Sequence, residues 1–173
     1  MIDNFFDVKD LPEIKDLKSI SYSDFSDHRG NIYTTFRRDF LGDIHGAFDH
    51  DKFSHSKKNV LRGFHADYKS KKIVTCVYGK ILQVFCDYRS NSETYLNVYS
   101  KILHHSDLMS FYVPVGVLNA YYVMSERAVY HYKYDYIGEY ADVENQITVA
   151  WNNPLINFNW PTKQPILSER DTL

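Results

Sequence analysis

The chain has 173 residues, with 20 Lys plus Arg against 22 Asp plus Glu and a formal net charge of -2. This length is enough for one domain, residues 1–173, with a full hydrophobic core, and the nearly balanced charge argues against a nucleic-acid partner. No apolar run approaches the roughly 20 residues that a membrane span requires, and the N-terminus lacks a basic flank followed by an apolar stretch. We therefore expect a cytoplasmic protein that has no membrane partner.

Short runs rich in Val, Ile, Tyr and Phe alternate with turn signals along the chain, which predicts an all-β protein with few helices. Turn residues at Asp27–Gly30, Arg89–Ser92 and Pro114–Gly116 separate several of these runs. Short strands at such regular spacing are typical of a sandwich or a barrel. The predicted strands are, in chain order, Asn31–Arg38, Val60–Ala66, Lys72–Tyr78, Ile81–Tyr88, Tyr95–Ile102, Ser110–Val113, Asn119–Met124, Ala128–Tyr134 and Thr148–Trp151.

Two cysteines, Cys76 and Cys86, flank a predicted hairpin turn at residues 78–81. A tight hairpin there would place Cys76 opposite about position 83 rather than opposite Cys86. The spacing thus disfavours a disulfide, and we expect two buried thiols in a reducing compartment.

The sequence also lacks the usual patterns of metal ligands. No Cys-x-x-Cys motif is present, and His65-Ala66-Asp67 lacks the second histidine of a His-x-His motif. His104 and His105 are adjacent, so on a strand they would face apart. No metal site is predicted.

A histidine and a distant carboxylate are the first candidates for catalysis. His65 ends the segment Asn59–His65, and Asp171 lies near the C-terminus. An imidazole can act as a base near neutral pH when a carboxylate holds its other nitrogen as a donor. Arg62 and His65 would face opposite sides of a regular strand, but a bulge at Gly63 would turn both towards one pocket. The alternative is a core histidine and a carboxylate in a solvated tail.

A series of ordered blocks covers nearly the whole chain. They are Asp27-His28-Arg29-Gly30, Asn59-Val60-Leu61-Arg62-Gly63-Phe64-His65, Tyr78-Gly79, Asp87-Tyr88-Arg89, Val113-Pro114-Val115-Gly116, Tyr132-Lys133, Trp151-Asn152-Asn153, Trp160-Pro161 and Leu167-Ser168-Glu169-Arg170-Asp171. Together they resemble the nucleotide-sugar 4-keto-6-deoxyhexose 3,5-epimerases, a cupin-type family typified by dTDP-4-dehydrorhamnose 3,5-epimerase. The resemblance implies a jelly-roll of two antiparallel sheets with short peripheral helices, a homodimer that exchanges strands, and a nucleotide-sugar substrate held in the barrel mouth.

The same resemblance implies roles for individual residues. His65 matches the catalytic base, Asp171 the carboxylate that orients it, and Tyr132 the general acid. Lys72 matches a lysine near the C4 oxygen of the substrate. Arg29 and Arg62 match the arginines that the family uses to bind the substrate and its diphosphate.

These residue types suit an epimerisation through an enolate. A proton next to a 4-keto group is acidic only when a nearby donor, here Lys72, stabilises the developing enolate oxygen. His65 would remove the proton from one face and Tyr132 would return one from the other. Inversion at C3, at C5 or at both then requires no cofactor and no metal.

Two departures from the hexose pattern indicate a branch of the family. Asn119 stands where most hexose enzymes carry a histidine, and an asparagine can donate a hydrogen bond to an enolate oxygen but cannot shuttle protons. The segment Tyr134–Tyr140 also differs from the hexose loop, and its Tyr136 and Tyr140 are further candidates for substrate binding. With the blocks Thr75–Gly79 and Ile166–Asp171, these features resemble enzymes that act on GDP-linked 4-keto-heptoses for capsular polysaccharide biosynthesis.

Several alternatives stay open at this point. The chain could instead be a dTDP-4-keto-6-deoxyhexose 3,5-epimerase, a sugar 3,4-ketoisomerase or a catalytically silent sugar-nucleotide binding protein. The full pattern from Arg62 to Asp171 argues against the ketoisomerase. Retention of His65, Tyr132 and Asp171 together argues against the silent binder.

Overall fold

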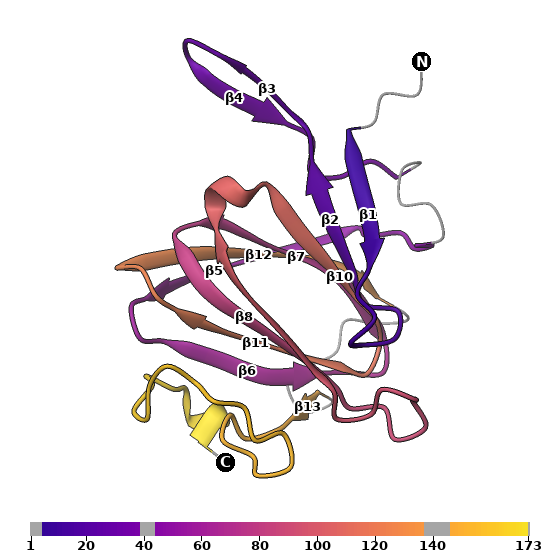
Figure 1. The fold of residues 1–173 in the computed structure, drawn as a ribbon, viewed down its shortest axis with the longest axis vertical. Helices are drawn as coiled ribbons and strands as arrows, with labels where there is room; N and C mark the ends of the chain where they lie inside the picture. The colour runs from indigo at the N-terminus through magenta and orange to yellow at the C-terminus, as the bar shows by residue number, and fades with distance from the viewer. Residues whose placement is uncertain (1–4, 39–43, 137–145, 173) are drawn as a thin grey trace.

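Two antiparallel β-sheets form the body of the protein in a computed structural model that describes residues 5–38, 44–136 and 146–172. One sheet has the strand order β1-β2-β10-β7-β12-β5 and the other the order β13-β6-β11-β8-β9. Figure 1 shows the two sheets facing each other, with the hairpin β3–β4 projecting at one end of the molecule. The predicted all-β jelly-roll is therefore confirmed.

The six-stranded sheet consists of β1 (Phe6–Asp10), β2 (Lys18–Tyr22), β10 (Met109–Val113), β7 (Ser70–Tyr78), β12 (Arg127–Tyr136) and β5 (His50–Lys57). The five-stranded sheet consists of β13 (Ile147–Thr148), β6 (Leu61–Ala66), β11 (Val117–Val123), β8 (Lys80–Asp87) and β9 (Val98–His104). The projecting hairpin consists of β3 (Asp24–Asp27) and β4 (Gly30–Tyr33). Helical structure in the described residues is limited to the 3-10 turns η1 (His105–Asp107) and η3 (Glu169–Thr172). None of the described helices is long and apolar enough to cross a membrane.

Six of the nine predicted strands agree with observed strands to within two residues at each end, namely β6, β7, β8, β10, β11 and β12. The prediction for β9 begins three residues too early, the one for β13 overlaps it by a single residue, and Asn31–Arg38 extends well past the end of β4. The sequence patterns do not predict strands β1, β2, β3 and β5. In β5 the sequence His-Asp-Lys-Phe-Ser-His-Ser-Lys is polar at almost every position, because the strand lies at a sheet edge with most side chains exposed.

The predicted hairpin at residues 78–81 is wrong. Strands β7 and β8 follow each other directly, but β7 pairs with β10 and β12 while β8 pairs with β9 and β11. The chain crosses between the sheets at Gly79, where φ is +88° and a Cβ atom would lie 2.2 Å from the carbonyl oxygen of Arg127. Cys76 and Cys86 consequently lie in different sheets, and both are buried and free.

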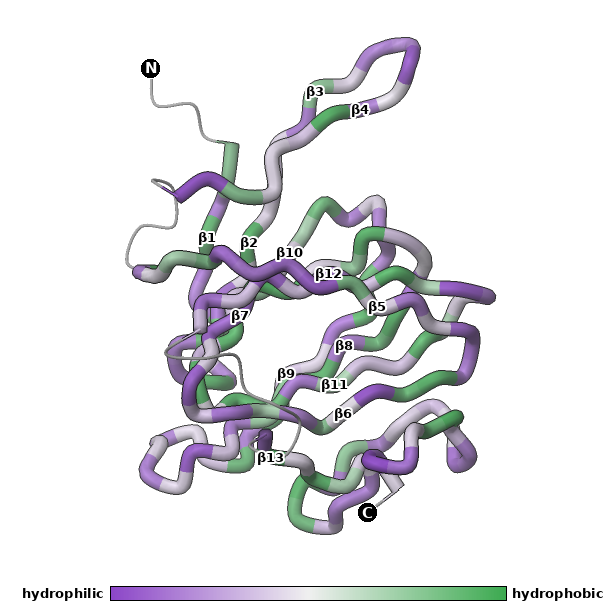
Figure 2. The backbone as a smooth tube through the Cα atoms, turned by 180° about the vertical axis from the view of Figure 1, so that it is seen from behind, coloured by the Kyte–Doolittle hydropathy of each residue, from purple (hydrophilic) through white to green (hydrophobic). Residues whose placement is uncertain are grey.

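Strand β11 carries hydrophobic cores on both of its faces. Val117 and Tyr121 belong to the core between the two sheets, whereas Leu118 and Ala120 pack into a second core with Trp160 from the C-terminal segment. Figure 2 shows hydrophobic stretches both in strands of the body and in the C-terminal segment that lies next to β6. Because side chains alternate along a strand, Asn119 shares the inner face with Val117 and Tyr121.

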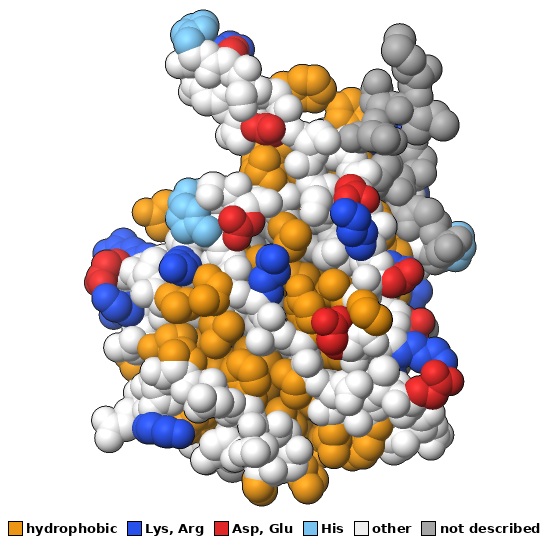
Figure 3. All heavy atoms as spheres, viewed as in Figure 1, with side chains coloured by type: hydrophobic (Ala, Val, Ile, Leu, Met, Phe, Trp, Pro, Cys, Tyr) orange, Lys and Arg blue, Asp and Glu red, His pale blue; other side chains and the backbone are white. Residues whose placement is uncertain are grey.

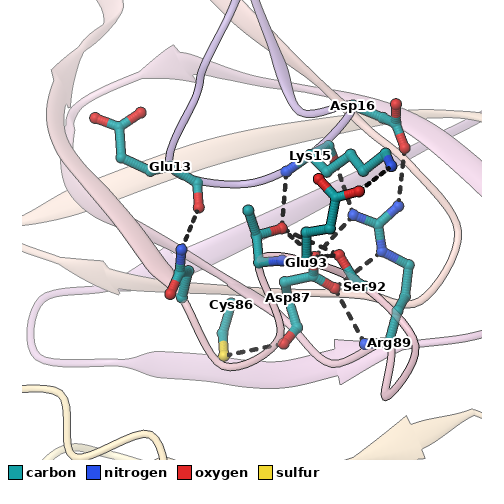
Figure 4. A network of polar contacts seen from close by, with 10 residues as sticks. Glu13, Lys15, Asp16, Cys86, Asp87, Arg89, Ser92 and Glu93 are labelled. Carbon is teal, nitrogen blue, oxygen red and sulfur yellow. Dashed lines mark hydrogen bonds and ion pairs between the residues drawn. The ribbon is translucent and has the colours of Figure 1, made fainter.

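A buried carboxylate secures the end of β8 (Figure 4). Asp87 is fully buried and accepts hydrogen bonds from Arg89, Ser92 and Thr94, while Nη1 of Arg89 lies 3.0 Å from a carboxylate oxygen of Asp16. Burial on its own would raise the pKa of Asp87, but these hydrogen bonds together lower it to about 2. The network fixes the predicted turn at Arg89–Ser92 against the N-terminal segment.

Candidate active site

A cavity of about 350 Å³ opens between the two sheets. Strands β5, β7 and β12 supply one wall, strands β6 and β11 supply the opposite wall, and the segment Ser168–Asp171 also contributes to the lining. The cavity therefore occupies the place where the jelly-roll interior meets the C-terminal turn.

A histidine–carboxylate pair lies in this cavity. Nε2 of His65 is 2.7 Å from Oδ1 of Asp171, and the other carboxylate oxygen accepts a hydrogen bond of 2.8 Å from Oγ of Ser168. Burial opposes ionisation of Asp171, but the contacts with His65, Ser168 and Arg170 outweigh it and lower the pKa of this carboxyl. An ionised carboxylate can only accept, so Nε2 of His65 is the donor, and in the neutral form of the imidazole the lone pair is on Nδ1.

A β-bulge brings Arg62 and His65 into the same cavity. His65 pairs with Asn119 and Arg62 pairs with Tyr121, so three steps along β6 match two steps along β11. The bulge contains Gly63, which has a φ of +111°. Both Arg62 and His65 line the cavity, which confirms the predicted bulge.

Lys72 and Tyr132 lie on the wall that faces His65. Removal from water lowers the pKa of Lys72 to about 8, although the carboxylate of Asp67 opposes this change. Burial and the neighbouring Tyr121 and Tyr134 hold the pKa of Tyr132 well above its usual value. Tyr132 is consequently a neutral phenol that can give up a proton to a strong base such as an enolate or carbanion.

Basic side chains outnumber acidic ones around the cavity. Four basic residues line it, Lys52, Arg62, Lys72 and Arg170, against two acidic residues, Asp67 and Asp171. The guanidinium of Arg170 donates from Nε to Thr148 and from Nη1 to Gln146, but its buried Nη2 has no hydrogen-bond partner among the described residues. This excess of positive charge around the cavity suits an anionic ligand such as a diphosphate.

Of the remaining predicted site residues that the structure describes, one lines the cavity and two do not. Asn119 lines the cavity, but Arg29 lies outside it, in the turn of the hairpin β3–β4, where its guanidinium binds Asp27. Tyr136 ends β12 opposite Ser70 and is not among the cavity residues. Tyr140 lies outside the described residues. The prediction that Arg29 binds substrate therefore has no support within a single chain.

Sequence reasoning missed several residues that line the cavity. Lys52 and Ser54 come from β5, the polar edge strand that the sequence patterns do not predict. Arg170 adjoins Asp171 in one of the ordered blocks, but the sequence alone assigns it no role. A signal for Lys52 and Ser54 existed, since their period of two matches the alternation of a strand with one face towards the interior. Among the described residues no group of three or more His, Cys, Asp or Glu side chains could hold a metal ion.

Comparison with known proteins shows what this fold and site are similar to. The family model for dTDP-4-dehydrorhamnose 3,5-epimerase matches residues 12–173. The dTDP-4-dehydrorhamnose 3,5-epimerase of Escherichia coli is 31% identical over 166 residues, which cover 92% of this chain and 88% of that protein.

Two solved structures extend the likeness to the fold. The Legionella pneumophila dTDP-6-deoxy-D-glucose-3,5-epimerase, in complex with dTDP-4-keto-L-rhamnose, superposes with a TM-score of 0.86 at 29% identity over 96% of this chain and 89% of that chain. A 3'-monoepimerase from Streptomyces bikiniensis, in complex with dTDP-quinovose, gives a TM-score of 0.81 at 25% identity over 90% of this chain and 80% of that chain. Similar folds thus serve double and single epimerisation.

Proposed function

Because this chain belongs to the dTDP-4-dehydrorhamnose 3,5-epimerase family, we propose that it inverts C3, C5 or both carbons of a nucleotide-linked 4-keto sugar. The observation that carries the proposal is the placement of an acid and a base on opposite walls of one cavity. His65, paired with Asp171, belongs to the five-stranded sheet, and Tyr132 belongs to the six-stranded sheet. A sugar ring between them would present one face to each.

The proposed reaction begins when Nδ1 of His65 removes the proton from a carbon next to the C4 carbonyl. The electron pair of the broken C–H bond moves towards C4, and the developing enolate oxygen is stabilised by the ammonium group of Lys72 and by Asn119. Tyr132 then donates its phenolic proton to the same carbon from the opposite face, which inverts the centre. Every step uses side chains of this chain and requires neither a metal nor a nucleotide cofactor.

The basic side chains of the cavity give the substrate's diphosphate a place to bind. Arg62 and Arg170 both line the cavity, Arg62 from strand β6 and Arg170 from the C-terminal turn η3. We assign the diphosphate to these two arginines because planar guanidinium groups match phosphate oxygens in geometry and charge.

A dTDP-linked 4-keto-6-deoxyhexose is the substrate that the relatives favour. The family model and the E. coli relative are both named for dTDP-4-dehydrorhamnose, and two of the similar structures carry dTDP-linked sugars. A GDP-linked 4-keto-heptose for capsular polysaccharide is the second candidate. It is favoured by Asn119, which replaces the histidine of the hexose pattern within the cavity lining.

Incubation of the protein with each sugar nucleotide in D2O tests the function and the substrate together. Deuterium at C3 and C5, read by NMR and mass spectrometry, is expected for a 3,5-epimerase, and deuterium at one carbon indicates a single epimerase. The sugar with the larger kcat/KM is the preferred substrate. Binding without deuterium in either sugar would overturn the proposal in favour of a silent binder, and migration of the carbonyl would indicate a ketoisomerase.

A further inference from the structure

Two fully buried residues, Gln83 and Tyr130, contact Asn119 without lining the cavity themselves. Nε2 of Gln83 donates to Oδ1 of Asn119 at 2.7 Å and to the backbone carbonyl of Ala120 at 2.9 Å. The hydroxyl of Tyr130 donates to Oε1 of Gln83 and lies 3.3 Å from Oδ1 of Asn119. Strands β8, β11 and β12 thus meet in one buried hydrogen-bond network.

The network determines which way each amide faces. The carbonyl groups of Ala120 and Val84 can only accept hydrogen bonds, so the group of Gln83 that faces them must be its NH2. The same NH2 faces Asn119, and Asn119 must therefore present its oxygen to Gln83. Nδ2 of Asn119 is left with no hydrogen bond to any described residue, on a side chain that lines the cavity.

We propose that Gln83 and Tyr130 are positioning residues that hold the carboxamide of Asn119 so that its Nδ2 donates to the C4 oxygen of the substrate. This inference rests on the proposed function and adds the means by which an asparagine replaces a histidine as an enolate donor. The terminal torsion of an asparagine has two nearly equivalent orientations in isolation. The wrong one would point a carbonyl oxygen at the enolate, so a fixed orientation is required for stabilisation.

A double-mutant cycle on kcat tests the proposal. Asn119→Ala removes the donor and is expected to lower kcat about 100-fold, the effect of losing one preorganised donor. Gln83→Met and Tyr130→Phe each release the carboxamide and are expected to lower kcat by about 10-fold or more, with KM changed less than about 3-fold. In the Asn119→Ala background either change should add almost nothing, because the group that it positions is already gone.

Tyr22→Phe is the matched control, since Tyr22 is also a buried tyrosine whose hydroxyl bonds a side chain, here that of Ser110 on strand β10, and neither residue lines the cavity. It is expected to leave kcat unchanged. If Gln83→Met and Tyr130→Phe lower kcat equally with and without Asn119, or if they change only KM, then Gln83 and Tyr130 act only on folding or binding. Either result overturns the proposal.

Side-chain amide exchange provides a readout that does not depend on turnover. In the unmodified protein the Nε2 protons of Gln83 should be protected from exchange with water, and the Nδ2 protons of Asn119 should exchange from the cavity. The reverse pattern would overturn the assigned orientation. A protein with this exchange pattern but no deuterium incorporation into either sugar would refute the proposed function and leave the orientation established.

Discussion

The charge on Asp171 determines which nitrogen of His65 carries a proton. In Asp171→Asn the side chain keeps its shape, but its amide can face His65 as a donor and select the wrong tautomer. We expect kcat to fall by about 10³-fold or more with the fold intact, because a histidine held in the wrong tautomer cannot act as the base. Deuterium incorporation at C3 and C5 measures the loss.

Glu169→Gln is the matched control for Asp171→Asn, because it removes a nearby negative charge in the same 3-10 turn from a side chain that is exposed and not part of the cavity lining. Its kcat should equal that of the unmodified protein. An Asp171→Asn variant with undiminished kcat would refute the orienting role.

Lys72 links activity to pH through its low pKa of about 8. Its charged form stabilises the enolate, and the charged fraction decreases as the pH rises through 8, so kcat should decline above that pH. The decline should be absent from the residual activity of Lys72→Met. Lys71→Met is the control, since Lys71 lies outside the cavity lining beside Asp135, and it should keep the decline.

The same lysine should cost stability at neutral pH. Its pKa is about 8 in the folded protein against about 10.4 in an unfolded chain, so between these values the unfolded chain binds more protons and stability rises with pH. At pH 7 the buried charge opposes folding. We therefore expect Lys72→Met to raise the melting temperature at pH 7 while it lowers kcat, and a lower melting temperature would contradict this account.

Residue-level reasoning identified the His65–Asp171 pair because both residues lie in ordered blocks that resemble a known family. It did not identify Lys52, because the period of two that Lys52 shares with Ser54 does not stand out among the equally polar neighbours of this octapeptide. It also could not assign Gln83, since the partner of a buried amide depends on pairing between strands distant in sequence.

At the scale of the element, the bulge in β6 is the feature that builds the site. A Cβ atom on Gly63 would lie 2.5 Å from the carbonyl oxygen of Asn119, and the φ of +111° is itself strained for other residues. Gly63→Ala should lower the free energy of unfolding by about 2 to 5 kcal/mol, from backbone strain together with overpacking. Urea denaturation measures this change.

Gly30→Ala is a closely matched control, because Gly30 has a φ of +130° but a Cβ atom there would have no described atom within 4 Å outside its chain neighbours. It isolates backbone strain from steric conflict, so its effect should be the smaller of the two. Equal effects would show that the contact with Asn119 does not constrain the bulge.

Local sequence patterns predicted the bulge at Gly63 but not the path of the chain between β7 and β8. A Tyr-Gly-Lys sequence between two apolar runs is typical of a hairpin. The two strands lie in different sheets only because β7 pairs with β10 and β12 while β8 pairs with β9 and β11. Competition between tertiary pairings is not visible in a window of about ten residues, which explains why the individual strands were predicted better than their connections.

At the scale of the whole molecule, the hairpin β3–β4 stands clear of the two sheets. Figure 3 shows it projecting from the body, with charged side chains at its tip. Its strands pair only with each other among the described strands, and an isolated two-stranded hairpin is marginally stable in water. Phe25 and Ile32 are cross-strand neighbours on it, and they are 63% and 72% exposed. Such a hairpin gains stability when a second copy of the chain covers it.

We therefore expect a homodimer in solution, with a mass about twice the 20.4 kDa of the chain. Replacement of Phe25 and Ile32 together by aspartate should shift the protein to monomer in sedimentation velocity. Leu155→Asp is the control, because Leu155 is 66% exposed but lies outside the hairpin, and it should leave the mass unchanged.

Arg29 lies in the turn of the same hairpin and does not line the cavity of its own chain. If the hairpin of one subunit reaches the cavity of the other, the monomeric variant and Arg29→Ala should both raise KM, and only the first should change the mass. A monomeric unmodified protein, or a double aspartate variant that remains dimeric, would refute the role given to the hairpin.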